Sequence, residues 1–249
     1  MRYAIYFAAP ADDALIRAGN AWLGRDPFTG ERLAQPTMND LSTEQFAELT
    51  TDPRRYGFHG TLKAPFHLKD GATEAGLIAA CEAMADETAP FEIQGLAVNA
   101  LGKFLALTPT VPEPDLADFA SLCVRWFEPF RTQTLNEADL ERRRKSGLTP
   151  AQDRNLVEWG YPYIFDDFRF HMTLSNKVED TEAACALKSA ATDHFAELTA
   201  RPRAITHFGL YTEAERGTPF KVHSIFPLGG ERTPTAALAD LLANTEVSK

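Results

Sequence analysis

The sequence predicts an α+β fold in which two pseudo-symmetric lobes of antiparallel sheet and helices enclose a central cleft. Strand-like and helix-like patterns follow one another in the same order in both halves, and the segment FHGTL at 58–62 recurs 112 residues later as FHMTL at 170–174. A long repeat that occurs only twice indicates two similar halves rather than a solenoid. Since 249 residues can bury a substantial core, we expect one bilobal domain over residues 1–249.

The first half begins with alternating aromatic residues that predict a strand at 2–8. Asp12 and Asp13 are typical of the N-terminus of a helix, here 12–23, and turn residues fill the loop that follows. Ser42 and Gln45 have the spacing of a capping box and predict a helix at 41–50. The other predicted elements are the first motif strand at 56–68 with a bulge or an end at Pro65, a helix at 73–88, strands at 91–101 and 103–108 joined by a turn at Gly102, and a helix at 115–130.

A helical insertion at 131–163, exposed or acting as a lid, separates the two halves. Its run 137–145 carries four bases and three acids, and Thr149 and Pro150 begin a second helical stretch. This run is typical of a solvated helix face, although its Arg142, Arg143 and Arg144 could fold over an anionic ligand. The second half is predicted to contain the second motif strand at 168–178, a helix at 180–198, strands at 204–211 and 220–227, and a helix at 235–243.

Charge and composition limit the classes of partner. The formal net charge of -10 is the wrong sign for binding long nucleic acid through many phosphates, but a cleft with local positive charge can still hold one small phosphorylated substrate. The three cysteines are scattered and the first residues do not form a signal peptide, so we expect a cytoplasmic protein. No apolar run is long enough for a membrane span. The oligomeric state stays open.

The repeated segment carries the candidate chemistry. In an extended strand alternate side chains share a face, so His59, Thr61 and Lys63 are predicted to lie together, and Arg169, His171 and Thr173 likewise. Two His-x-Thr sets in matching contexts are far less expected by chance than one. The strand pair would therefore present two imidazoles and two hydroxyls to one cleft.

Two facing imidazoles suit general acid and general base catalysis, because an unperturbed histidine titrates near neutral pH. Thr61 and Thr173 could donate to phosphate oxygens, and Lys63 and Arg169 could add positive charge. No spacing typical of a metal site stands out, and we expect a metal-independent reaction without a cofactor. Such a set is suited to opening a strained cyclic phosphodiester.

The two motif copies resemble the two-histidine phosphoesterase superfamily, whose members act on cyclic phosphates and RNA ends. More narrowly, the segments at 2–7, 22–26, 141–145, 159–163 and 168–174 resemble the family of domain of unknown function 1045, commonly encoded beside bacterial phosphonate-utilisation genes. The resemblance implies a bilobal fold, a catalytic pair at His59 and His171, and phosphate binding by Thr61 and Thr173. Tyr163 is added as a substrate-binding candidate only because it precedes the second motif.

Three functions remain open at this point. The genomic association implies a phosphodiesterase that opens ribose 1,2-cyclic phosphate in phosphonate catabolism, an inference by analogy. A 2′,3′-cyclic nucleotide or RNA-end phosphodiesterase fits the same residues. A non-catalytic protein that binds a phosphate or phosphonate ligand would keep the cleft without turnover.

Overall fold

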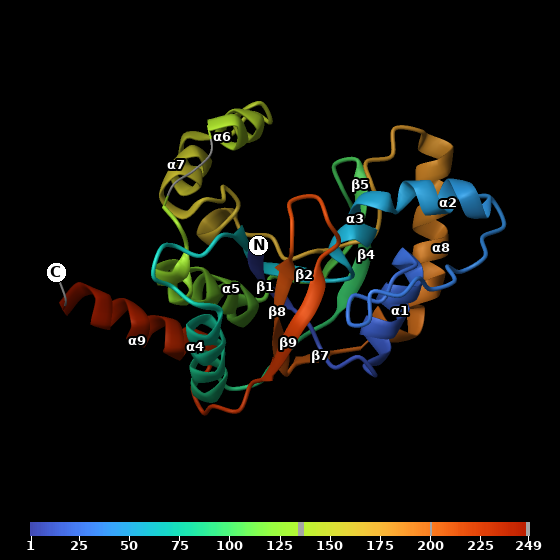
Figure 1. Cartoon of the computed structure of the whole chain (residues 1–249). Coiled ribbons are helices and arrows are strands. Elements are labelled where there is room, and N and C mark those ends of the chain that lie inside the picture. The colour runs from blue at the N-terminus through green and yellow to red at the C-terminus, as the bar shows by residue number, and fades with distance from the viewer. Residues whose placement is uncertain (134–136, 200, 248–249) are drawn as a thin grey trace.

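The computed structural model describes residues 1–133, 137–199 and 201–247, and the strands in these ranges form two antiparallel sheets (Figure 1). The larger sheet has the strand order β4-β5-β6-β2-β1-β8-β9, and the smaller pairs β3 with β7. The strands are β1 (Arg2–Phe7), β2 (Gly60–Phe66), β3 (Phe91–Ile93), β4 (Leu96–Leu101), β5 (Phe104–Pro109), β6 (Met172–Thr173), β7 (Arg203–Ile205), β8 (His207–Glu213) and β9 (Lys221–Pro227).

Helices flank the sheets on two sides in Figure 1, with α4, α5 and α9 on one side and α1, α2 and α8 on the other, while α6 and α7 stand away from the rest. The α-helices are α1 (Ala14–Leu23), α2 (Thr43–Leu49), α3 (Thr51–Tyr56), α4 (Glu74–Glu87), α5 (Pro114–Trp126), α6 (Glu137–Arg144), α7 (Pro150–Trp159), α8 (Thr181–Thr199) and α9 (Pro234–Val247). Short 3-10 turns occur at Glu128–Phe130 and Phe165–Asp167. Among the described residues, no helix has the length and apolar character needed to cross a membrane.

The duplication predicted from the sequence is confirmed by the order of the elements. β2 is followed by α4, β3, the β4–β5 hairpin and α5, and β6 is followed by α8, β7, the β8–β9 hairpin and α9. The halves exchange their hairpins, because β5 pairs with β6 of the second half and β8 pairs with β1 of the first. The predicted α+β class with antiparallel pairing is therefore confirmed, and the exchange joins both halves in one continuous sheet.

The main core lies against one face of the large sheet, and a small second cluster lies against the other. Tyr3, Ile5 and Phe7 of β1 lie in the main core together with buried residues of α1, α4, α5 and α8. Tyr6, which points the other way, belongs to a small second cluster with Tyr211. Because side chains alternate along a strand, the residues that share the face of Tyr6 lie outside the main core and can contribute to a functional site.

The first motif strand is shorter than predicted and irregular. Residues 51–56 form α3, which ends at Gly57 with φ 79°, and the strand begins only at Gly60. The predicted bulge at Pro65 is confirmed, since the register of β1 with β2 shifts between the pairs Ile5–Lys63 and Tyr3–Phe66. Proline lacks the N–H that a regular ladder requires.

The second motif segment, predicted as a strand over 168–178, pairs as a strand only at Met172–Thr173. Beyond Thr173 the amide of Leu174 still donates to the carbonyl of Leu105 at 2.8 Å, but side chains take over other backbone hydrogen bonds. The indole Nε1 of Trp22 donates to the carbonyl of Leu174 at 2.9 Å, and the amide of Leu105 donates to Oγ of Ser175 at 2.9 Å. The strand therefore ends where tertiary contacts compete with the backbone.

The insertion contains two helices, as predicted. α7 begins with the reciprocal hydrogen bonds between Thr149 and Gln152 of a capping box, and the same arrangement between Ser42 and Gln45 begins α2. At the base of the insertion, Arg131 donates to the carbonyl of Glu158 at 2.8 Å. The insertion is thereby fixed to the body, and its Arg142 and Arg143 line the same cavity as Tyr6 of β1.

Candidate active site

The pairing of β2 with β6 brings the two motif copies together. Gly60 is opposite Met172 in an antiparallel register, so His59 is opposite Thr173 and Thr61 is opposite His171. Directly opposite Cβ atoms in such a pair lie about 4.5–5.5 Å apart, and diagonal neighbours such as the two histidines about 7–8 Å apart. Two imidazoles and two hydroxyls thus alternate around the corners of one small quadrilateral.

The middle pair of this register packs against the core. Met172 is fully buried, and a Cβ atom on Gly60 would lie 2.4 Å from Cε2 of Phe170. Only a residue without a side chain lets the Phe170 ring lie against the backbone of β2. Gly60 therefore keeps the two strands close enough for the motif residues to share one site.

The ring of His59 is oriented by contacts on both nitrogens and on its plane. Nδ1 donates to the carbonyl of Gly57 at 2.8 Å, and Nε2 lies 3.3 Å from Oγ1 of Thr61. The ring stacks on Tyr6 with centroids 3.9 Å apart and an interplanar angle of 26°. A carbonyl can only accept, so the proton of the neutral ring lies on Nδ1 and the lone pair of Nε2 is available.

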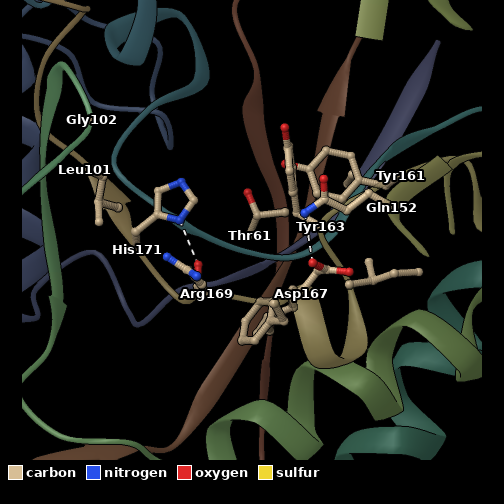
Figure 2. Close-up of a pocket in the computed structure, with 13 residues that line it drawn as sticks. Thr61, Leu101, Gly102, Gln152, Tyr161, Tyr163, Asp167, Arg169 and His171 are labelled. Carbon is tan, nitrogen blue, oxygen red and sulfur yellow. Dashed lines mark hydrogen bonds between the residues drawn. The ribbon is translucent and has the colours of Figure 1, made fainter. Parts of the chain in front are cut away.

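His171 repeats this arrangement in the second half. Its Nδ1 donates to the carbonyl of Arg169 at 2.8 Å, again two residues earlier in the chain. Figure 2 shows this hydrogen bond and shows the imidazole and the Thr61 hydroxyl extending into the same space. When neutral, both rings therefore carry their proton on Nδ1, which leaves the lone pair of Nε2 available.

Two adjoining cavities lie over the motif residues. The first, which we call the His171 cavity, measures about 420 Å³ and is lined by Thr61, Tyr163, Arg169 and His171, among others. The second measures about 550 Å³ and is lined by His59, Thr61 and Thr173 together with five arginines. Thr61, Ala64 and Tyr161 line both cavities, so the two histidines line adjoining parts of one cleft.

Of the seven residues selected from the sequence, six line this cleft. His59, Thr61 and Thr173 line one cavity, and His171 with the exposed Arg169 and Tyr163 lines the other. The ring of Tyr163 lies edge-on to Tyr161, with centroids 5.7 Å apart. The exception is Lys63.

The prediction that Lys63 shares a face with His59 and Thr61 is wrong. Thr61 pairs with Tyr6 but Lys63 pairs with Ile5, so the register shift between them turns Lys63 toward the core. Its ammonium, 4% exposed, donates to the carbonyl of Val124 and to Glu128, both at 2.8 Å. Lys63 therefore lies on the opposite side of the sheet from the histidines.

Several of the arginines that line the cleft could not be predicted from the sequence. The five arginines that line the larger cavity, which we call the arginine cavity, are Arg2, Arg55, Arg142, Arg143 and Arg216. Only the basic run at 142–144 in the insertion indicated a contact with an anion. In the structure Arg142 and Arg143 line the cavity, whereas Arg144 pairs with Asp153 at 2.6 Å. The other three lie far apart in sequence and are brought together by β1, α3 and the turn between β8 and β9.

Burial strongly affects the protonation of His59. Desolvation lowers the pKa of His59 from 6.5 to about 4, the hydrogen bond to Gly57 opposes this shift, and the nearby His171 adds to it. At neutral pH the His59 ring is therefore uncharged, and its Nε2 can accept a proton.

We expect the free energy of unfolding to fall as the pH drops from about 6.5 to about 4. Over this range the unfolded chain binds a proton at His59 that the folded chain does not, so acid favours unfolding. Urea unfolding of the wild type and of His59→Gln across this range isolates the contribution, and the variant should show the shallower dependence on pH. Parallel curves for the two proteins would contradict the assignment.

Within the described ranges, no group of three or more His, Cys, Asp or Glu side chains is arranged to hold a metal ion. The polar groups that line the cleft include imidazoles, hydroxyls and guanidinium groups, together with Asp167 and Gln152 in the His171 cavity. The imidazoles, hydroxyls and guanidinium groups can transfer protons and bind anionic oxygens.

Comparisons with known proteins give one family and several partial similarities. The family model described as "Protein of unknown function (DUF1045)" matches residues 61–221. The chain is 36% identical over 233 residues to the ribose 1,5-bisphosphate phosphokinase PhnN of Janthinobacterium sp. (strain Marseille), covering 92% of this chain and 51% of that protein. It is 32% identical over 222 residues to the protein of the same name from Laribacter hongkongensis (strain HLHK9), covering 89% and 50%. The chain thus spans about half the length of these curated relatives.

Solved structures are similar only at low identity. The crystal structure of TT0787 of Thermus thermophilus aligns with a TM-score of 0.44 and 13% identity, covering 93% of this chain and all of that one. The structure of Escherichia coli LigT complexed with 3′-AMP aligns with a TM-score of 0.37 and 14% identity, covering 91% and 97%.

Proposed function

The chain belongs to the DUF1045 family, and we propose that it is a phosphodiesterase that opens a small cyclic phosphate by general acid and general base catalysis. The observation that carries the proposal is the pairing of β2 with β6, which places His59, Thr61, His171 and Thr173 on one face of the sheet. Each imidazole is held by a backbone carbonyl with Nε2 available. The proposal agrees with the resemblance of both motifs to two-histidine phosphoesterases.

In the proposed reaction His59 is the base and His171 the acid. Nε2 of neutral His59 takes a proton from water, the oxygen attacks phosphorus, and the bond from phosphorus to one ester oxygen breaks. His171 takes part as the imidazolium, with a proton on both nitrogens, and gives its Nε2 proton to the departing alkoxide. A cyclic diester thus becomes a phosphate monoester with a free hydroxyl. We assign the base role to His59 because burial keeps its imidazole neutral at pH 7.

The threonines and Arg169 have supporting roles in this proposal. Thr61 is opposite His171 and Thr173 is opposite His59, so each hydroxyl can donate to a non-bridging oxygen beside an imidazole. Arg169 and Tyr163 line the His171 cavity and can contact the remainder of the substrate. These groups supply both proton transfers and oxygen contacts, so the proposed reaction uses no metal ion or cofactor.

The substrate we propose first is ribose 1,2-cyclic phosphate, a small ester hydrolysed in the cytoplasm during phosphonate catabolism. The relatives from Janthinobacterium and Laribacter are named for a ribose bisphosphate, which supports a sugar phosphate as the ligand class. The alternative is a 2′,3′-cyclic nucleotide or an RNA end, since the catalytic groups contact only the phosphate. The net charge of -10 makes long nucleic acid an unsuitable partner.

Hydrolysis assays test the function. Purified protein is incubated, with chelator present, with ribose 1,2-cyclic phosphate, 2′,3′-cyclic nucleotides and short RNAs with cyclic ends. We expect turnover of at least one cyclic phosphate, with the ribose ester preferred. No turnover of any of them, or turnover that chelator abolishes, would contradict the proposal; tight binding without turnover would favour a ligand-binding protein instead.

A further inference from the structure

We propose that the arginine cavity binds a second phosphate group, so that the substrate carries a phosphate monoester in addition to the ester that is opened. This inference rests on the proposed function and specifies the chemical class of its substrate. Within a chain of net charge -10, five of the 25 basic residues line one cavity of about 550 Å³. None of the described residues that line it is Asp or Glu.

One buried carboxylate holds two of the five arginines in place. Glu213, fully buried, accepts from Arg2 at 2.5 Å and from Arg55 at 2.9 Å. The guanidinium groups of Arg2 and Arg55 also lie near the rings of Phe220 and Tyr56, with distances of 5.8 and 4.2 Å to the ring centroids. Two cations share one anion here, so a net positive charge remains at the cavity wall.

The insertion supplies another part of the cavity wall. Arg143 lies 4.8 Å from the ring centroid of Tyr161, a residue that lines both cavities. Arg142 lines the same cavity from α6, and Arg216 reaches it from the turn between β8 and β9. The described lining residues thus contribute five guanidinium groups and no carboxylate to the cavity wall, an arrangement that suits a dianion.

The arginine wall extends along β1 away from the position of His59. Tyr6 stacks on His59, and at a rise of about 3.3 Å per residue Arg2 lies about 13 Å further along β1. The Thr61 and Thr173 hydroxyls, with the two imidazoles, already surround the ester to be opened. The outer arginines are therefore placed for an anionic group on another part of the same small molecule.

The first measurement is calorimetric titration with inorganic pyrophosphate. We expect the double variant Arg143→Gln/Arg216→Gln to weaken binding by about tenfold or more, since each change removes charged hydrogen-bond donors to the anion. The matched control is Arg144→Gln, because Arg144 lies on the same helix but pairs with Asp153 outside the cavity. Equal weakening by both changes, or no pyrophosphate binding by the wild type, would overturn the inference.

The second measurement compares each cyclic phosphate that is hydrolysed with its counterpart carrying a further phosphate on the 5-hydroxyl of the ribose. We expect the added phosphate to raise kcat/KM by about tenfold or more, mainly through KM, in the wild type and in Arg144→Gln but not in Arg143→Gln/Arg216→Gln. Equal kcat/KM for both members of a pair would overturn the second phosphate and leave the phosphodiesterase intact. No hydrolysis of either member would count against the proposed function, and pyrophosphate binding would then decide the inference alone.

Discussion

Replacing either His59 or His171 by alanine is expected to lower kcat of the cyclic phosphodiesterase by about 10²–10⁴-fold, because each removes one proton-transfer group. The two side chains serve one reaction, so the double variant should lose little more activity than the weaker single variant. The measurement is steady-state hydrolysis of the preferred cyclic phosphate. Circular dichroism and thermal unfolding confirm that the variants are folded.

The matched control for these changes is His67→Ala. His67 is exposed at the end of β2, where Nδ1 contacts the carbonyl of Met1 at 2.9 Å, and it does not line either cavity of the cleft. Its replacement should leave kcat and KM close to the wild-type values. Activity that persists in the double variant His59→Ala/His171→Ala would rule out the proposed mechanism.

Removing Glu128 is expected to destabilise the protein by about 3–5 kcal/mol, because the change leaves buried cations without their partner. Glu128 contacts Lys63 at 2.8 Å and Arg131 at 2.7 Å, and both cations are almost fully buried. Urea unfolding of Glu128→Ala against the wild type measures the loss. Burial already lowers the pKa of Lys63, and Glu128 opposes that shift.

The opposite change, Lys63→Met, should have a much smaller effect on stability. Glu128 would still accept from Arg131 at 2.7–3.2 Å, and the thioether can occupy the apolar site of the lysine stem. Because Lys63 lies on the core side of the sheet, this variant should also keep its kcat/KM for the cyclic phosphate. A large loss of activity in a folded Lys63→Met protein would show that the lysine acts in the cleft after all.

The proposed catalytic residues could be predicted from the sequence because a strand has a fixed period of two. That period places His59 beside Thr61 and His171 beside Thr173, and the recurrence of the segment predicts two such rows in equivalent parts of the fold. The family prediction is confirmed by the match over residues 61–221. Which strands are neighbours did not follow from the pattern, yet the pairing of Gly60 with Met172 decides that the rows meet.

The errors arose where tertiary contacts override local patterns. The register shift beside Lys63 depends on how β1 and β2 fit together, which strand parity does not describe. β6 ends close to the point where Trp22 donates to the carbonyl of Leu174 and Ser175 accepts from the amide of Leu105. Trp22 and Leu105 are far from β6 in the sequence, so the local pattern does not indicate these contacts. Arg2, Arg55 and Arg216 come from separate elements, so no local run of charge indicates their cavity.

A crystal structure of the protein with orthovanadate, an analogue of a five-coordinate phosphorus, tests the central claim most directly. The account predicts vanadate between β2 and β6, with Nε2 of both His59 and His171 about 2.6–3.2 Å from its oxygens and the hydroxyls of Thr61 and Thr173 also in contact. Vanadate bound away from these strands, or held by only one of the two imidazoles, would contradict it.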